Sequence, residues 1–137
     1  MRKSIILLTA LVLAATSLAA PALAAKSKKG SFTAQALPYP GPDGCNNSAS
    51  QVTEAFKAPA TGILTVTMVD FDGDWDLFVN DSSGSELGSA TASQLTGDAP
   101  EEEVLVAVRK GSQVLMGPCN WAGGMSATVN WVFKATK

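Results

Sequence analysis

The 137-residue chain contains no histidine. A Ser-His triad, a Cys-His pair and a histidine-based zinc site are therefore excluded. Paired carboxylates can hydrolyse glycosides, but they must face each other across a cleft, and the aspartates of this chain gather in one short stretch. We therefore expect a protein that is not an enzyme and that acts by binding.

Basic residues are also scarce. Ten Lys and Arg, less Arg2 and Lys3 of the N-terminal leader, leave eight against twelve Asp and Glu, which is a net charge of −4. Three of those eight, Lys26, Lys28 and Lys29, lie together near the start of the mature chain. The rest of the chain lacks the basic surface that nucleic acids require, so we expect no nucleic-acid partner.

A long apolar run occurs at the N-terminus. Arg2 and Lys3 precede an apolar core from Ile5 through Ala20, and Ala22-Leu23-Ala24 forms a small-x-small cleavage site. These features predict a cleaved signal peptide at residues 1–24, and hence a protein of the periplasm, cell envelope or external medium. The alternative is an uncleaved N-terminal anchor, but the core is short for a membrane span. We expect no membrane span after cleavage.

Cys45 and Cys119 are the only cysteines. An even count in an exported chain predicts one disulfide between them. That bond would close a long loop, which the chain-entropy model values at roughly 4 kcal/mol. It would link the N-terminal start of the domain to its last hairpin.

No stretch after the signal has a helical repeat of apolar residues with caps. Alternating residues and Gly/Pro turns instead predict strands at 52–57, 63–69, 75–80, 101–109, 113–116 and 126–135. We therefore expect an all-β protein, an antiparallel β-sandwich at residues 50–137, after an extended Pro/Gly/Lys-rich tail at residues 25–49. The predicted core consists of Phe56, Leu64, Val66, Met68, Leu77, Val79, Val104, Val106, Val108, Val129, Trp131 and Phe133.

Four aspartates, Asp70, Asp72, Asp74 and Asp76, alternate around Gly73. Side chains of equal parity share one face of an extended segment, so these carboxylates repel one another unless something stabilises them. Calcium takes six to eight oxygen ligands, and these four with Asp81 are the candidate ligands. The alternative is that the aspartates cap N–H groups of turns and face solvent.

Three tryptophans are the candidates for an aromatic contact surface. Trp131 alternates with core residues and is expected to be structural. Trp121 lies in a Gly-rich stretch beside Cys119 and is the best candidate for a surface contact, with packing on the disulfide as the alternative. Trp75 is a second candidate contact, although its parity is opposite to that of the aspartates and also fits an inward side chain.

Two charged groups flank the strand predicted at 101–109. Glu101, Glu102 and Glu103 open it, and we expect them to form a solvated edge that discourages pairing between sheets. Arg109 and Lys110 end it, and we expect them to be ordinary surface residues.

Asp74-Trp75-Asp76-Leu77-Phe78-Val79 resembles the Asp-x-Asp-Leu-aromatic-Val strand of the bacterial pre-peptidase C-terminal domain. Phe56, Pro59 and Gly62 are similar to the strand and turn that precede that motif, and the resemblance covers about residues 50–135. The chain departs from the family at Val114, where the family has a tyrosine.

The resemblance implies a jelly-roll-like β-sandwich that is not catalytic. Domains of this family assist the secretion, folding or substrate contact of exported enzymes, and some bind calcium or insoluble polymers. We therefore expect a secreted accessory or binding module that contacts a protein or polysaccharide surface and that calcium stabilises. The alternative is a structural or interaction protein of the cell envelope with no small ligand.

Overall fold

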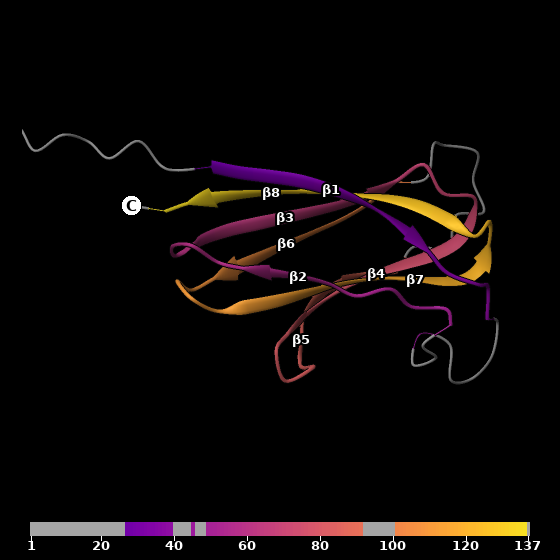
Figure 1. Cartoon of the computed structure of the whole chain (residues 1–137), viewed down its shortest axis with the longest axis horizontal. Helices are drawn as coiled ribbons and strands as arrows, with labels where there is room; N and C mark the ends of the chain where they lie inside the picture. The colour runs from indigo at the N-terminus through magenta and orange to yellow at the C-terminus, as the bar shows by residue number, and fades with distance from the viewer. Residues whose placement is uncertain (1–26, 40–44, 46–48, 92–100, 137) are drawn as a thin grey trace, which may run out of the picture.

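The described part of the chain is an all-β sandwich (Figure 1). The computed structural model describes residues 27–39, 45, 49–91 and 101–136. The predicted signal peptide, residues 1–24, lies outside these ranges. The described residues include no helix of the length and apolarity that a membrane crossing needs. Their strands are β1 (Ser27–Gln35), β2 (Glu54–Lys57), β3 (Gly62–Val69), β4 (Gly73–Asp81), β5 (Glu86–Ala90), β6 (Glu102–Val108), β7 (Gln113–Gly123) and β8 (Ser126–Ala135).

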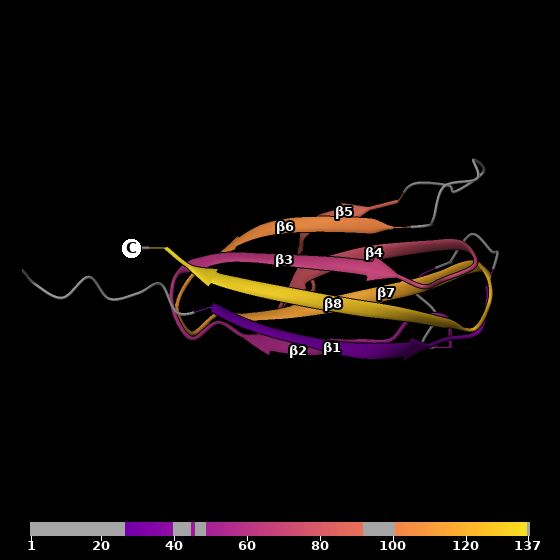
Figure 2. The ribbon, with the colours of Figure 1, turned by 90° about the horizontal axis from the view of Figure 1, so that it is seen from above.

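Two four-stranded antiparallel sheets make up the sandwich. Sheet A has the order β1-β8-β3-β6, and sheet B has the order β2-β7-β4-β5. Figure 2 shows the strands of sheet A side by side. Apart from the β4–β5 hairpin, each connection passes from one sheet to the other, which is the winding of an eight-stranded jelly roll. The predicted antiparallel, jelly-roll-like sandwich is confirmed.

The sandwich begins earlier than the sequence analysis expected. Ser27–Gln35 forms β1, which pairs with β8 from Ser126 to Lys134, so the prediction of an extended tail outside the sandwich is wrong for this segment. The inward positions of β1 are small or partly buried, with Gly30 beneath the Trp131 ring and Ala34 fully buried. Such small residues among polar ones give a weak alternation, so the edge of β8, and not the hydrophobicity of β1, decides that this segment is a strand.

The core lies between the sheets and contains the predicted residues, with one change. Trp131 is only partly buried, and the centroid of its ring lies 5.0 Å from that of Phe56. Fully buried residues that the sequence analysis did not place in the core include Trp75 and Met116. Met116 belongs to β7, which continues through Gly117 and Pro118 where the sequence predicts that the strand ends.

The predicted disulfide between Cys45 and Cys119 is present, with its Cα atoms 5.5 Å apart. Beside it, residues 50–52 run along β7. The N–H of Asn120 donates to the Ser50 carbonyl at 2.8 Å, and the N–H of Val52 donates to the Pro118 carbonyl at 3.2 Å. The disulfide and these bonds hold Cys45 and residues 50–52 against β7.

The turn from β3 to β4 depends on two residues with positive φ. Asp70 has a φ of 55° and Gly73 a φ of 82°. Asp adopts this conformation more easily than most side chains, and Gly does so without steric cost. A Cβ atom on Gly73 would also overlap the Ala122 carbonyl oxygen on β7, so no other residue fits there without backbone movement.

We predict that Gly73→Ala destabilises the fold more than Gly84→Ala. Gly84 has nearly the same φ, 86°, but its Cβ would meet open space. Gly84→Ala should therefore lose only about 1–2 kcal/mol for the left-handed conformation. Gly73→Ala should lose roughly 1–3 kcal/mol more, because β7 must shift. Denaturant unfolding of both variants measures the difference, and equal losses would contradict the close approach of the two strands.

Candidate functional site

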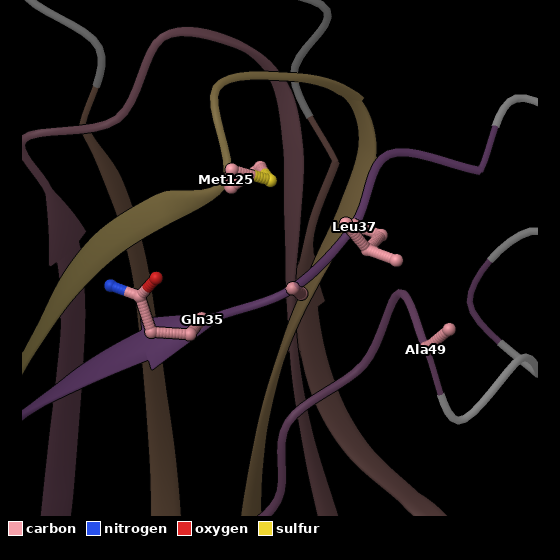
Figure 3. A pocket seen from close by; sticks show the side chains of 5 residues that line it. Gln35, Leu37, Ala49 and Met125 are labelled. Carbon is pink, nitrogen blue, oxygen red and sulfur yellow. The ribbon is translucent and has the colours of Figure 1, made fainter.

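One end of the sandwich carries a solvent-facing hollow of about 190 Å³, which we call the end hollow (Figure 3). Leu37 and Met125 on its rim are 55% and 57% exposed, and in Figure 3 the Met125 thioether points toward Leu37. Exposed apolar side chains that gather around a concavity are typical of a contact surface. The hollow is lined by Gln35, Ala36, Leu37, Ala49 and Met125.

Backbone hydrogen bonds fix the walls of the end hollow. The N–H of Ala36 donates to the Met125 carbonyl at 3.1 Å, so the end of β1 is joined to the β7–β8 turn. The N–H of Leu37 donates to the Ala49 carbonyl at 2.8 Å, which sets the third wall. Three segments far apart in the sequence thus meet at one place, and the hollow exists before any partner binds.

Asn120 clamps two of these walls from inside. Its side chain is fully buried, and Nδ2 donates to the carbonyl oxygens of Ala36 and Gly124, each at 2.9 Å. Its Oδ1 is buried with no hydrogen-bond partner among the described residues, so the stabilisation comes from the two N–H donations. The sequence analysis missed Asn120, because nothing in a lone Asn on an apolar strand distinguishes it from a turn residue.

Asn120 points inward because it has the same parity on β7 as the buried Val114 and Met116, and a β-bulge follows it. Trp75 is opposite Asn120 while Asp74 is opposite Ala122, so Trp121 is the extra residue on β7. A bulge of this kind bends the strand and redirects its side chains. The Trp75 indole N–H donates to the Gly124 carbonyl at 3.0 Å, which is the same oxygen that Asn120 contacts.

The candidate calcium ligands are spread over the β3–β4 turn and the whole length of β4. Asp70 and Asp72 lie in the β3–β4 turn, Asp74 and Asp76 are partly buried on the outer side of β4, and Asp81 is at the far end of the strand. Within the described residues, no group of three or more acidic, cysteine or histidine side chains is placed to hold a metal ion. Calcium binding by these residues stays a prediction from the sequence.

Asp81 caps the β4–β5 turn. Its Oδ1 accepts hydrogen bonds from the N–H groups of Ser83 and Ser85 at 2.8 and 3.0 Å, and from the Ser83 hydroxyl at 2.6 Å. The hydroxyl bond, followed by the backbone bonds, holds the pKa of Asp81 below its usual 3.8. Turn capping thus accounts for this carboxylate without a cation.

Asp76 lies in an environment that is less favourable for a charged carboxylate. It lies opposite Cys119, and its Oδ2 is 3.8 Å from the Cys45 Sγ atom of the disulfide. Burial raises the pKa of Asp76 from 3.8 to about 6, and the neighbouring Asp74 carboxylate adds to the effect. The charge on Asp76 therefore opposes folding at neutral pH.

We predict that Asp76→Asn stabilises the fold at neutral pH but not in acid. Because the folded pKa is higher than the unfolded one, the contribution of Asp76 to stability falls as pH rises from 3.8 to about 6. The unfolding free energy of Asp76→Asn minus that of the parent should therefore rise across this window and then level off. Denaturant unfolding of both proteins at a series of pH values measures this difference in unfolding free energy.

Asp81→Ala is the control of opposite sign. The pKa of Asp81 is lowered on folding, so its contribution is present above pH 3.8 and is lost as pH falls through the folded pKa. Asp81→Ala should be less stable than the parent at neutral pH, and the difference should shrink in acid. Equal pH profiles for Asp76→Asn and the parent would show that Asp76 is fully solvated.

The tryptophans do not form an aromatic platform. Trp75 is fully buried, so the prediction of a surface contact there is wrong. Its position on β4 has the same parity as Leu77 and Val79, and all three point into the core. Trp121 is partly buried on β7, and Tyr39 is the one aromatic residue among the large exposed side chains in the described part of the chain.

The expected solvated edge at Glu101 to Glu103 is only partly present. Glu101 and Glu103 are exposed, but Glu102 is 2% exposed and accepts a hydrogen bond from the Leu77 N–H at 3.2 Å. Alternation on β6 places Glu102 on the core side with Val104, so the prediction is wrong for this residue. Its carboxyl group joins β6 of sheet A to β4 of sheet B.

No family model matches the chain, and no curated protein matches its sequence. PliG of Aeromonas hydrophila, a periplasmic lysozyme inhibitor of g-type lysozyme, is 15% identical with a TM-score of 0.44, covering 81% of this chain and 86% of that one. A cleaved adhesin domain of Lys-gingipain from Porphyromonas gingivalis is 13% identical with a TM-score of 0.41, covering 81% and 91%. A carbohydrate binding module from Cellvibrio mixtus lichenase 5A, in complex with cellotriose, is 16% identical with a TM-score of 0.36, covering 77% and 97%.

At these identities and scores the likeness is one of general β-sandwich shape, and we take no function from it. The resemblance to the pre-peptidase C-terminal domain stays a prediction based on its motif residues.

Proposed function

We propose that this chain is an exported, non-catalytic binding module that accepts an apolar side chain of a protein partner in the end hollow. The observation that carries the proposal is the exposure of Leu37 and Met125 around a concavity whose walls are already fixed by hydrogen bonds. A preformed site loses little conformational freedom on binding. The disulfide supports export, because such bonds persist in oxidising compartments.

The lining of the end hollow favours a protein over a polysaccharide. Aliphatic and thioether groups make its rim, and a methionine side chain adapts to partners of different shape. Sugar rings bind best on the exposed face of an aromatic ring. The exposed Tyr39 lies near the end hollow in the sequence, but the residues that line the hollow include no aromatic side chain.

The charge beside the end hollow favours a basic partner segment. The acidic β3–β4 turn packs on the β7–β8 turn, where the Gly124 N–H donates to the Asp72 carbonyl at 3.0 Å, next to Met125. The mature chain predicted from the sequence also carries a net charge of −4, from eight basic and twelve acidic residues. We infer a partner segment that combines an apolar side chain with Lys or Arg.

Site-specific photocrosslinking in the exporting cell tests the proposal. A photoreactive amino acid is placed at Met125, and a matched one at Lys57, an exposed residue of β2. Position 125 should give an adduct with one reproducible protein, and position 57 should not. Equal adducts at both positions, or none at 125, would favour the alternative of a structural envelope protein.

The partner identified in this way should bind Leu37→Asp at least ~10-fold more weakly than the parent, since central contacts dominate binding energy. Leu37 is 55% exposed, so the substitution should leave the melting temperature nearly unchanged. Unchanged affinity of Leu37→Asp would show that the partner binds elsewhere.

A further inference from the structure

The outer face of sheet A, which points away from the core, carries an apolar patch. Leu105 on β6 is 61% exposed, and Ile63 on β3 and Val132 on β8 are each 37% exposed. Leu105 and Val132 are both in register with Thr65 of β3, one on each side of it. Figure 2 shows these three strands side by side. An exposed leucine on an edge strand favours association with another sheet.

Two opposite charges lie at diagonal corners of this patch. Glu103 of β6 is in register with Thr67, two residues after Thr65 on β3. Lys134 of β8 is in register with Ile63, two residues before Thr65. Each charge is thus one strand and two residues from Thr65, roughly 4.8 Å across and 6.8 Å along the sheet, in opposite directions. Both side chains are exposed.

We propose that this face binds the same face of a second copy of the chain, around a two-fold axis that passes over Thr65. The axis lies in the interface, parallel to the sheet and perpendicular to the line from Glu103 to Lys134. Rotation about it exchanges the two positions, so each Glu103 faces the other copy's Lys134. The same axis brings each Leu105 close to the other copy's Ile63. An isologous interface requires such self-complementarity, and this face has it in both charge and apolar surface.

The second copy is favoured over a different partner because the face carries charges of both signs. A surface that binds an acidic or a basic partner has mainly one sign of charge. This face has Glu103 of β6 on one side of the apolar centre, and Lys134 of β8 with Lys29 of β1 on the other. Strands of the two copies would cross steeply, as in orthogonal sheet packing. The patch is small, so we expect a weak dimer with a dissociation constant on the order of 10–100 µM.

Sedimentation velocity of the exported, oxidised chain tests this proposal, over concentrations from about 5 µM to about 1 mM. Glu103→Lys and Lys134→Glu should each weaken association at least ~10-fold, because each places like charges opposite one another. The double variant Glu103→Lys/Lys134→Glu should restore association to within ~3-fold of the parent, because the pairs re-form with exchanged signs.

Lys57→Glu is the matched control. It changes the net charge as Lys134→Glu does, but it lies on β2 of sheet B, and it should leave association unchanged. Leu105→Glu should abolish the dimer, with a thermal melt to show that the variant is folded. A parent that stays monomeric throughout, or a double variant no better than the single ones, would overturn the proposal. The end hollow is made of other residues, so this result is independent of the proposed function.

Discussion

Trp75 and Asn120 face each other across β4 and β7, and both donate a hydrogen bond to the carbonyl oxygen of Gly124. This shared acceptor fixes the β7–β8 turn against the ends of β4 and β1. A buried N–H without an acceptor costs about 1–3 kcal/mol, so both side chains hold the turn in one position. Alternation along β7 places Asn120 on the inward side, and the bulge at Trp121 lies between it and Gly124.

The end hollow follows from this arrangement. Leu37 and Met125 are exposed because the turn that carries Met125 and the strand end that carries Leu37 are held at the rim, where neither side chain can enter the core. The disulfide between Cys45 and Cys119 adds a second restraint on the same strand, one residue before Asn120. The proposed binding surface is thus held in place by groups beneath it, and a preformed surface loses less conformational entropy on binding.

The two proposed surfaces are compatible with each other. The end hollow lies where β1 ends (Figure 3). The patch around Thr65 lies on the outer face of sheet A. A dimer through sheet A would leave both end hollows open. Two linked sites on one target surface bind more tightly than one, so a weak dimer would strengthen contact with a repetitive partner.

Much of the fold was predictable from local pattern. Alternation on β3, β6 and β8 identified strands and core residues, because burying every second side chain is the property that a sandwich imposes on its sequence. The two cysteines were predictable as a pair by their count alone. β1 was not, because its small inward residues pack only once β8 and Trp131 lie beside them. Pro118 suggested a strand end, yet β7 continues through it next to the bulge.

The all-β class, the disulfide pair and the lack of histidine chemistry follow from the amino-acid sequence alone, since each depends on residue type or on a repeat within one segment. The link that Glu102 makes between the sheets and the clamp that Asn120 makes beneath the end hollow follow from the packing of the two sheets, as does the full burial of Trp75. These roles depend on partners up to 84 residues away in the chain. A local pattern contains no information about which distant carbonyl a side chain will meet, so such contacts arise only when the sheets close on each other.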